Sequence, residues 1–364
     1  MLNKSNSIIL YNIFYYAVYM FVVLTILPTT LGNIGYSNIE IGYMYSIMNS
    51  CNLLIVVLLI YFSFNTRNYI YTNLLALLST FFLVYLVYNN IYTRYMYLAI
   101  FLFAFFNLFN GSYLDSMTLN TFKEKYGYAR SFGSYGFFFT GLILFFFTID
   151  EKYYYIGLLI STFILFILSF KLSNDKDLHQ DINITWKHVI NEYWIWIFLF
   201  IFQLGMGIHY TYYSIYLINH DYQLNQIFLI WSIPVLFESL SFMFQKQIFN
   251  IFSIKSLILI SIIMTIIRFI LLEYFIDNFY LQIIINILHV FGFALIHSSL
   301  LNYFSTKYEN YYEYLKIYRA ILFGIALIVG AMLGGYLYST TNLLYIVAFI
   351  ISISLIPFFK IKLN

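Results

Sequence analysis

Long apolar segments follow one another along almost the whole chain, and most basic residues fall in every second gap between them. Of the 364 residues, 62% are hydrophobic and only 9% are charged, and the mean hydropathy is +0.82. Soluble domains carry about 25% charged residues, so a chain this apolar has too little polar surface to face water. The pattern predicts a polytopic membrane protein.

Twelve segments reach the length of about 20 residues that a membrane-spanning helix needs. None alternates polar and apolar residues as the strands of a membrane β-barrel do. The sequence therefore predicts an all-α fold with twelve transmembrane helices, at 8–31, 38–64, 69–88, 95–121, 130–149, 153–171, 190–217, 224–247, 256–274, 279–304, 314–338 and 342–359.

The basic residues indicate which way the chain faces. If the N-terminus is cytoplasmic, fifteen of the eighteen Lys and Arg residues fall on the cytoplasmic side, the exceptions being Arg94, Lys152 and the intramembrane Arg268. Short cytoplasmic loops concentrate Lys and Arg. We therefore expect a multi-pass protein of a bacterial inner membrane with both termini in the cytoplasm. Topology explains the net charge of +3, so no nucleic-acid partner is expected.

The longest polar stretch follows the sixth segment. It predicts a cytoplasmic linker at 172–189 between an N-terminal six-helix half at 1–171 and a C-terminal six-helix half at 190–364.

The two halves resemble each other in sequence. GYSNIEIGYMYSIMNSCNLL, from Gly35, aligns with DYQLNQIFLIWSIPVLFESL, from Asp221, at an offset of 186, which pairs Tyr36 with Tyr222. Weak internal symmetry is typical of transporters built from two six-helix repeats. In such folds the solute binds near mid-membrane between the halves.

Ionisable side chains inside the spans mark the expected site. A charge in lipid costs about 2.5–3.5 kcal/mol on insertion scales, so such residues persist where they are paired or face a watery cavity. Four consecutive segments of the second half carry five of them, and the first half carries one clear case. We expect these groups to share one polar cavity and to serve substrate binding or proton coupling: His209, Glu238, Arg268, His289, His297 and Asp115.

Arg268 keeps its charge at any ordinary pH and needs a counter-ion in a low dielectric. Glu238 is the only carboxylate at similar depth in that half of the sequence. Either the two form a static ion pair that locks two helices together, or Glu238 exchanges a proton and its partners during transport. Pro234, one turn before Glu238, removes a backbone hydrogen bond and is expected to bend the helix there.

The histidines are natural proton relays because they titrate near neutral pH. His289 and His297 are eight residues apart, which places them roughly on one side of a helix. They lack the i,i+4 spacing of a helical zinc site, so no metal is expected. For His209, a role in substrate binding and a structural hydrogen bond are both open.

Two roles are open for Asp115, namely coupling or substrate binding, and a salt bridge to Lys123 or Arg130 at the inner rim. Arg130 could instead bind carbonyl groups at helix ends across its half, and Gly133 lets its helix pack closely against neighbours. Further polar side chains could contribute to the cavity: Tyr212, Tyr213, Asn52 and Asn107.

Five stretches of the chain resemble signatures of one family. The phenylpropionate-permease-like branch of the major facilitator superfamily has sequences similar to LDSMTLNTFKEKYGYARSFGSYGF (114–137), GIHYTYYSIYL (207–217), FES (237–239), IIRFILL (266–272) and LHVFGFALIHSS (288–299). The resemblance runs over nearly the whole chain. More distantly, the chain is similar to lactose permease and to nucleoside–proton symporters.

The resemblance implies a proton-coupled permease for a small organic solute. In lactose-permease relatives a helix 8 carboxylate, a helix 9 arginine and a helix 10 histidine take part in coupling and binding, and Glu238, Arg268 and His289 match those positions. Gly292 stands where lactose permeases carry a glutamate, which leaves the proton site to Glu238 or a histidine. The loop at 65–68, Asn-Thr-Arg-Asn, keeps only the arginine of the Gly-Asp-Arg-Gly pattern of facilitators.

We therefore expect a secondary transporter of the major facilitator fold that moves a small organic solute, such as an aromatic or other organic acid, by proton symport with alternating access. The alternatives are a proton-independent uniporter or exchanger of a sugar or nucleoside, and a non-transporting membrane receptor. An enzyme is disfavoured because the sequence has no nucleotide loop or nucleophile arrangement. The expected partners are the solute, protons and the bilayer, with no cofactor, and the protein is expected to be a monomer.

Overall fold

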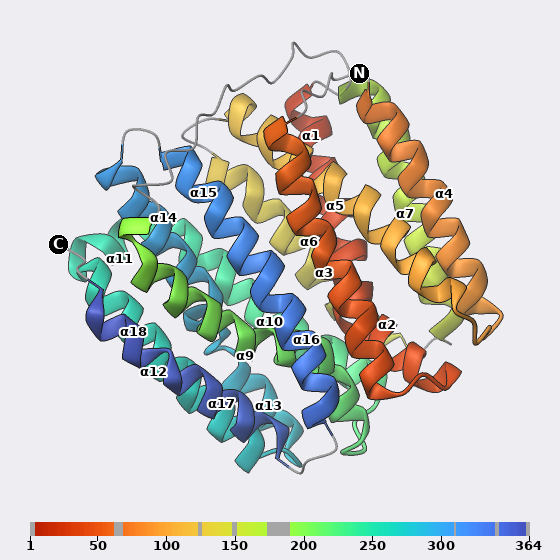
Figure 1. Cartoon of the computed structure of the whole chain (residues 1–364). Coiled ribbons are helices and arrows are strands. Elements are labelled where there is room, and N and C mark those ends of the chain that lie inside the picture. The colour runs from red at the N-terminus through yellow and green to blue at the C-terminus, as the bar shows by residue number, and fades with distance from the viewer. Residues whose placement is uncertain are drawn as a thin grey trace.

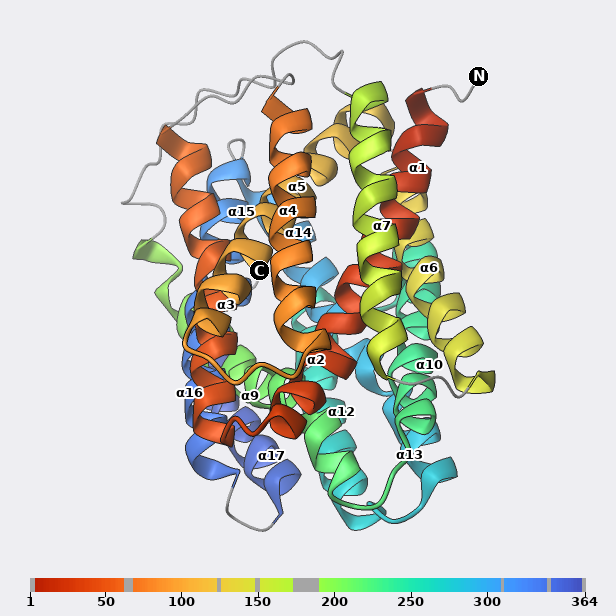
Figure 2. The ribbon, with the colours of Figure 1, turned by 90° about the vertical axis from the view of Figure 1, so that its right-hand side faces the viewer.

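The structure is an all-helical bundle (Figures 1 and 2). It is a computed structural model that describes residues 4–61, 68–122, 126–147, 151–172, 190–308, 311–338 and 342–361. Every regular element within these ranges is a helix. Short π-helical stretches, in which hydrogen bonds run from i to i+5, carry the label η.

The first part of the chain forms seven α-helices and one π-helical stretch in the described residues. They are α1 (Lys4–Phe14), η1 (Tyr15–Met20), α2 (Phe21–Ile34), α3 (Asn38–Tyr61), α4 (Asn68–Tyr88), α5 (Tyr95–Phe122), α6 (Tyr126–Phe146) and α7 (Glu151–Leu172).

The second part follows the same plan with more interruptions. Its elements are α9 (Tyr193–Ile218), α10 (Leu224–Met243), α11 (Gln245–Ile251), α12 (Ile254–Tyr274), α13 (Phe279–Asn286), η3 (Phe291–Leu295), α14 (Ile296–Lys307), α15 (Tyr311–Ala320), η4 (Ile321–Ile325), α16 (Ala326–Leu337), α17 (Leu343–Ile353) and α18 (Leu355–Lys360).

Eleven helical stretches of the described chain are long and apolar enough to cross a membrane. The expected span at 130–149 is the one outside this set, and it corresponds to the 21-residue helix α6. Polar and small residues in its opening sequence, Tyr-Gly-Tyr-Ala-Arg-Ser-Phe-Gly, lower its hydropathy. It nevertheless lies in the bundle, packed against α1 and α10. The predicted polytopic all-α fold is confirmed.

The two parts of the chain lie side by side. Figure 1 shows the red-to-yellow elements toward the upper right and the green-to-blue elements toward the left and the bottom. They meet where α3 packs on α16, α6 on α10, and α2 on α9. The predicted linker at 172–189 lies outside the described residues, apart from its first residue, so this boundary stays a prediction.

One contact occurs in both repeats. The Tyr36 hydroxyl donates to the carbonyl oxygen of Thr93 at 2.8 Å, and the Tyr222 hydroxyl donates to that of Ile276 at 2.6 Å. Each tyrosine follows the first span of its half and binds the loop after the third. The sequence alignment had paired these two tyrosines, so the internal symmetry predicted from sequence extends to equivalent hydrogen bonds.

Candidate functional site

Arg268 lies at the centre of a polar cluster within the described spans. The hydroxyl of Ser253 caps α12 by accepting from the backbone N–H of Ser256, and the helix then turns Ser261, Thr265 and Arg268 to one buried stripe. The arginine is only 1% exposed. A guanidinium held this far from water needs acceptors for its five N–H groups.

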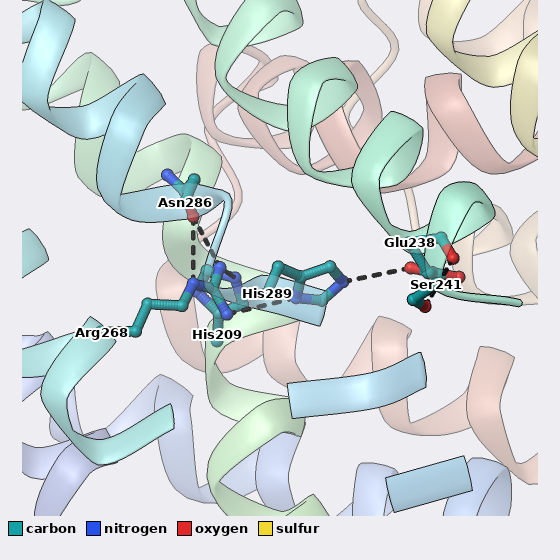
Figure 3. A network of polar contacts seen from close by, with 6 residues as sticks. All are labelled: His209, Glu238, Ser241, Arg268, Asn286 and His289. Carbon is teal, nitrogen blue, oxygen red and sulfur yellow. Dashed lines mark hydrogen bonds and ion pairs between the residues drawn. The ribbon is translucent and has the colours of Figure 1, made fainter. Parts of the chain in front are cut away.

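Three side chains supply acceptors for four of these five groups (Figure 3). Oδ1 of Asn286 accepts from Nη2 at 2.6 Å and from Nε at 3.2 Å. His289 Nδ1 lies 3.2 Å from Nη1, and His209 Nε2 lies 3.1 Å from Nη2. The partners come from α9 and from the two sides of the break that follows α13. Residues far apart in the sequence thus converge on one cation.

The arginine fixes the protons of both histidines. Because a guanidinium only donates, the ring nitrogens that face Arg268 must carry lone pairs. Each imidazole is therefore neutral, with its hydrogen on the other nitrogen, Nε2 in His289 and Nδ1 in His209. A second proton on His289 Nδ1 would point at the guanidinium. That protonation state and the present contact exclude each other.

Glu238 joins the cluster through His289 rather than directly. His289 Nε2 lies 3.7 Å from Oε2 of Glu238, so its hydrogen faces the carboxylate. In the part of the chain that the structure describes, Arg268 has no carboxylate within ion-pair distance. The direct Glu238–Arg268 pair considered from the sequence is therefore not formed, because the imidazole ring occupies the space between them (Figure 3).

Aromatic rings surround the cluster. The ring centroid of His209 lies 4.6 Å from that of Tyr213, 5.2 Å from Trp231 and 5.0 Å from Phe269. The Trp231 indole N–H donates to the Ser214 hydroxyl at 2.9 Å. These rings exclude water from the guanidinium and lower the local dielectric, which strengthens its electrostatic interactions.

His297 belongs to a different environment from His289. Its Nδ1 lies 2.8 Å from the Tyr318 hydroxyl, and its ring stacks on Phe293 at a centroid distance of 5.2 Å. The π-helical stretch η3 lies between them and interrupts the regular α-helix that their spacing assumes. Both histidines nevertheless lie beside α10, His289 near Glu238 and His297 with its ring centroid 6.3 Å from that of Phe242, so the shared side expected from the sequence stays a prediction.

Asp115 pairs with Arg319, a partner that the sequence had not suggested. Nη2 of Arg319 lies 3.2 Å from Oδ2 of Asp115, and the bridge joins α5 to α15 across the two halves. Of the partners first considered, Lys123 lies outside the described residues. The guanidinium of Arg130 stacks on Tyr16, with Cζ 3.7 Å from the ring centroid.

Gly133 makes room for that stacking. A Cβ at this position would lie 2.6 Å from Cδ2 of Tyr16, which real Cβ atoms do not tolerate. Pro234 is buried within α10, one turn before Glu238, and the bend expected there stays a prediction.

The other polar candidates lie outside the arginine cluster, with one exception. Asn52 donates to the carbonyl of Phe323 at 3.1 Å, across the halves, and Asn107 donates to its own helix at Phe103, 2.8 Å away. The exception is Tyr213, which contacts Asn286.

Tyr212 locks the two halves together at the end of the bundle where α3 begins. Its hydroxyl lies 2.8 Å from the carbonyl oxygen of Asn38 and 3.0 Å from that of Ala331. A Cβ on Gly334 would lie 2.5 Å from its ring, so the small residues of α16 let the ring enter.

The described residues hold no group of three or more His, Cys, Asp and Glu that could bind a metal ion. Sequence reasoning missed Asn286, which makes the shortest contact to Arg268. Its signal was the i,i+4 pair of amides, Gln282 and Asn286, in an otherwise apolar segment.

A bundle of membrane-spanning helices around a buried ionisable cluster is the architecture of a polytopic membrane transporter. The chain belongs to the MFS_1 like family, whose sequence profile matches residues 3–349. This membership places it among the major facilitator transporters and not among enzymes. No curated protein matches the chain in sequence.

Solved structures share the fold. The nucleoside transporter NupG has a TM-score of 0.78 at 15% identity, covering 99% of this chain and 98% of that chain. A bacterial metal transporter has a TM-score of 0.70 at 11% identity, covering 99% and 98%. The human organic anion transporter MFSD10 (TETRAN) has a TM-score of 0.67 at 10% identity, covering 98% of both chains. At these identities the similarity shows the fold, and the predicted major facilitator fold is confirmed.

Proposed function

We propose that this transporter moves a small organic anion together with protons. The observation that carries the proposal is the environment of Arg268, a buried cation whose hydrogen-bond acceptors among the described residues are a neutral amide and two neutral imidazoles. These groups accept from four of the five N–H donors of the guanidinium but do not neutralise its charge. A carboxylate solute would supply the missing negative charge and form a bidentate ion pair with the guanidinium.

His289 would couple this event to a proton. While Nη1 of Arg268 contacts His289 Nδ1, that nitrogen cannot take a proton. If an anionic solute draws the guanidinium away, Nδ1 is released, and Glu238 faces the other side of the same ring. Solute binding and proton binding would then favour each other, and both would shift the same conformational equilibrium.

Alternating access would operate between two sets of contacts at opposite ends of the bundle. One set lies where α3 begins and includes the 2.8 Å hydrogen bond from the Tyr212 hydroxyl to the carbonyl of Asn38. The other is the Asp115–Arg319 bridge. Rocking of one half against the other would break one set while the other holds. We also propose that the termini face the cytoplasm of a bacterial inner membrane and that the protein acts as a monomer.

Reconstituted proteoliposomes test this function. The probes are the organic anions 4-hydroxyphenylacetate and gluconate and the neutral solutes uridine and lactose, with protein-free liposomes to correct for passive diffusion. We expect accumulation of at least one anion when the lumen is alkaline, with net proton uptake into the lumen, and no accumulation of the neutral solutes.

Other outcomes would replace the proposal. Uridine or lactose uptake without anion uptake would make the protein a carrier of neutral solutes, in line with its structural similarity to the nucleoside transporter NupG. Anion uptake that reaches only equilibrium, with or without a pH gradient, would make it a uniporter. No flux of any probe, combined with binding, would favour a receptor.

A further inference from the structure

The amide of Asn286 occupies the place where a carboxylate would ordinarily neutralise Arg268. Its Oδ1 accepts from both Nε and Nη2, the edge of the guanidinium to which an Asp or Glu carboxylate can bind in a bidentate pair. Asn286 is 1% exposed, so water does not share this contact. The chain thus places a neutral oxygen at the closest point to its buried cation.

The orientation of this amide is forced by its other contacts. Nδ2 of Asn286 donates to the backbone carbonyl of Gln282 at 2.9 Å and to the hydroxyl of Tyr213 at 2.8 Å. A backbone carbonyl only accepts, so the amide cannot flip and present Nδ2 to Arg268.

Tyr213 and Gln282 are fixed in turn. The Tyr213 hydroxyl donates to Oε1 of Gln282 at 2.7 Å. Nε2 of Gln282 donates to the carbonyls of Leu272 and Phe275, at 2.7 and 3.1 Å, where α12 ends. Each donor in this chain of contacts has an acceptor, so the network holds one arrangement.

The local backbone brings Asn286 and His289 to the same guanidinium. The α-helix α13 ends at Asn286, and the next residues bond from i to i+3: the N–H of Ile287 to the carbonyl of Ile284, and that of Leu288 to that of Ile285. This tighter turn places residues three apart nearly above one another. The two acceptors therefore face Arg268 together.

We infer that Asn286 is a positioning residue that orients Arg268 while leaving its charge unpaired, and so determines that the site takes an anion. The inference rests on the proposed function. A carboxylate at this position would neutralise the guanidinium within the protein, and an anionic solute would then have to displace it. The neutral amide gives the orientation without that competition.

A double-mutant cycle on thermal stability tests the positioning role independently of any solute. The purified full chain is compared as wild type, Asn286→Asp, Arg268→Gln and the double variant, at one pH and scan rate in detergent. If Asn286 Oδ1 sits against the cation, N286D should cost more stability in the R268Q background than in the wild type. We expect a difference of about 5 °C in apparent Tm, because an unpaired buried carboxylate is strongly destabilising.

Asn107→Asp is the matched control. Asn107 is equally buried in α5, and its amide bonds only its own helix in the described contacts. N107D should lower Tm by the same amount in both backgrounds. Equal costs of N286D in both backgrounds, like those of N107D, would overturn the inference.

Solute selectivity gives the second readout, using benzoate and benzamide, which share a ring and differ in charge. Thermal shift should show that the wild type binds benzoate more tightly than benzamide. In N286D we expect the affinity for benzoate to fall at least about tenfold and the affinity for benzamide to stay the same. A preference of the wild type for benzamide would overturn the proposed anion transport and leave the positioning role supported. Retained benzoate affinity in N286D would overturn the selectivity role.

Discussion

Nη1 of Arg268 and Nδ1 of His289 lie 3.2 Å apart, and only one of the two atoms can carry the proton between them. The arginine keeps its protons, so the histidine must accept. The relationship links charge to position, because any movement of the guanidinium changes whether the imidazole can be protonated. It is the geometry on which the proposed coupling depends.

Glu238→Gln should separate solute binding from proton coupling. The amide keeps the size of the side chain and its place beside His289 but cannot exchange a proton with the ring. We expect gradient-driven accumulation of the anion to fall to the equilibrium level, while exchange of labelled for unlabelled solute continues. Uptake in proteoliposomes measures both.

Glu40→Gln is the control, since this half-buried carboxylate lies at the start of α3, where it accepts from the N–H of Ser37. Undiminished accumulation by E238Q would show that the carboxylate is not part of the proton path.

Arg268→Lys should weaken anion binding although it conserves charge. A lysine ammonium is a single point donor and cannot span Asn286, His289 and His209 as the planar guanidinium does. We expect a loss of about tenfold to a hundredfold in affinity for a carboxylate probe, measured by thermal shift. Arg94→Lys, an exposed loop residue, is the control. Equal affinity of R268K and the wild type would place the solute elsewhere.

Parts of this site could be predicted from the sequence, because ionisable side chains in apolar segments are rare and costly. His209, Glu238, Arg268 and His289 are predicted on those grounds, and the structure brings them together. Asn286 was missed because a neutral amide carries no such signal. Its importance comes from a position next to the guanidinium, which depends on how α12 and α13 pack.

The irregular backbone of the span that carries His289 and His297 is not predicted by the sequence. The eight-residue spacing of His289 and His297 assumes a regular α-helix, whereas this span passes through an i to i+3 turn and then η3. Neither feature follows from hydrophobic periodicity. The sequence also does not predict that His289 lies between Glu238 and Arg268. That arrangement depends on the directions of the side chains and not only on which helix carries each residue.

The Asp115–Arg319 bridge should make transport sensitive to salt. The arginine side chain is 45% exposed and the aspartate side chain 19% exposed. Solvent therefore screens the pair, and the bridge contributes less than about 1 kcal/mol to stability. Asp115→Asn and Arg319→Gln should each change the transport rate by no more than about fivefold, and the double variant should match either single one. Salt should alter the wild-type rate and not that of the double variant. Additive effects would show that the two residues act separately.

Tyr222 should make a contribution to stability that disappears in alkali. Burial raises the pKa of its phenol to about 12, and the hydroxyl donates to the carbonyl of Ile276. The unfolded chain loses this proton near pH 10. The stabilisation is therefore complete below pH 10 and is lost as pH rises toward 12. The Tm advantage of the wild type over Tyr222→Phe should shrink over that range.

Tyr36→Phe should behave in the same way, since burial also raises the pKa of Tyr36 and its contact with Thr93 is equivalent. A constant Tm difference from pH 9 to 12 in both variants would contradict this assignment.

Replacing His289 by Asn and by Gln should separate its contact with Arg268 from its contact with Glu238. The oxygen of an asparagine can take the place of Nδ1, whereas the longer glutamine reaches the place of Nε2. His289→Asn should keep an acceptor for Arg268 and lose the link to Glu238. We expect this variant to bind and exchange the anion normally but not to accumulate it against a gradient.

His289→Gln should show the opposite pattern. It keeps a group beside Glu238 but leaves Nη1 of Arg268 without its acceptor, and a buried unsatisfied donor costs about 1–3 kcal/mol. We expect a lower apparent Tm and weaker solute binding. His220, whose Nδ1 lies 2.8 Å from the carbonyl oxygen of Tyr216 in a loop, supplies the control with the same pair of substitutions. If H289N and H289Q lose accumulation and binding to the same degree, the imidazole does not bridge the carboxylate and the guanidinium during transport, and the proton must reach the site by another route.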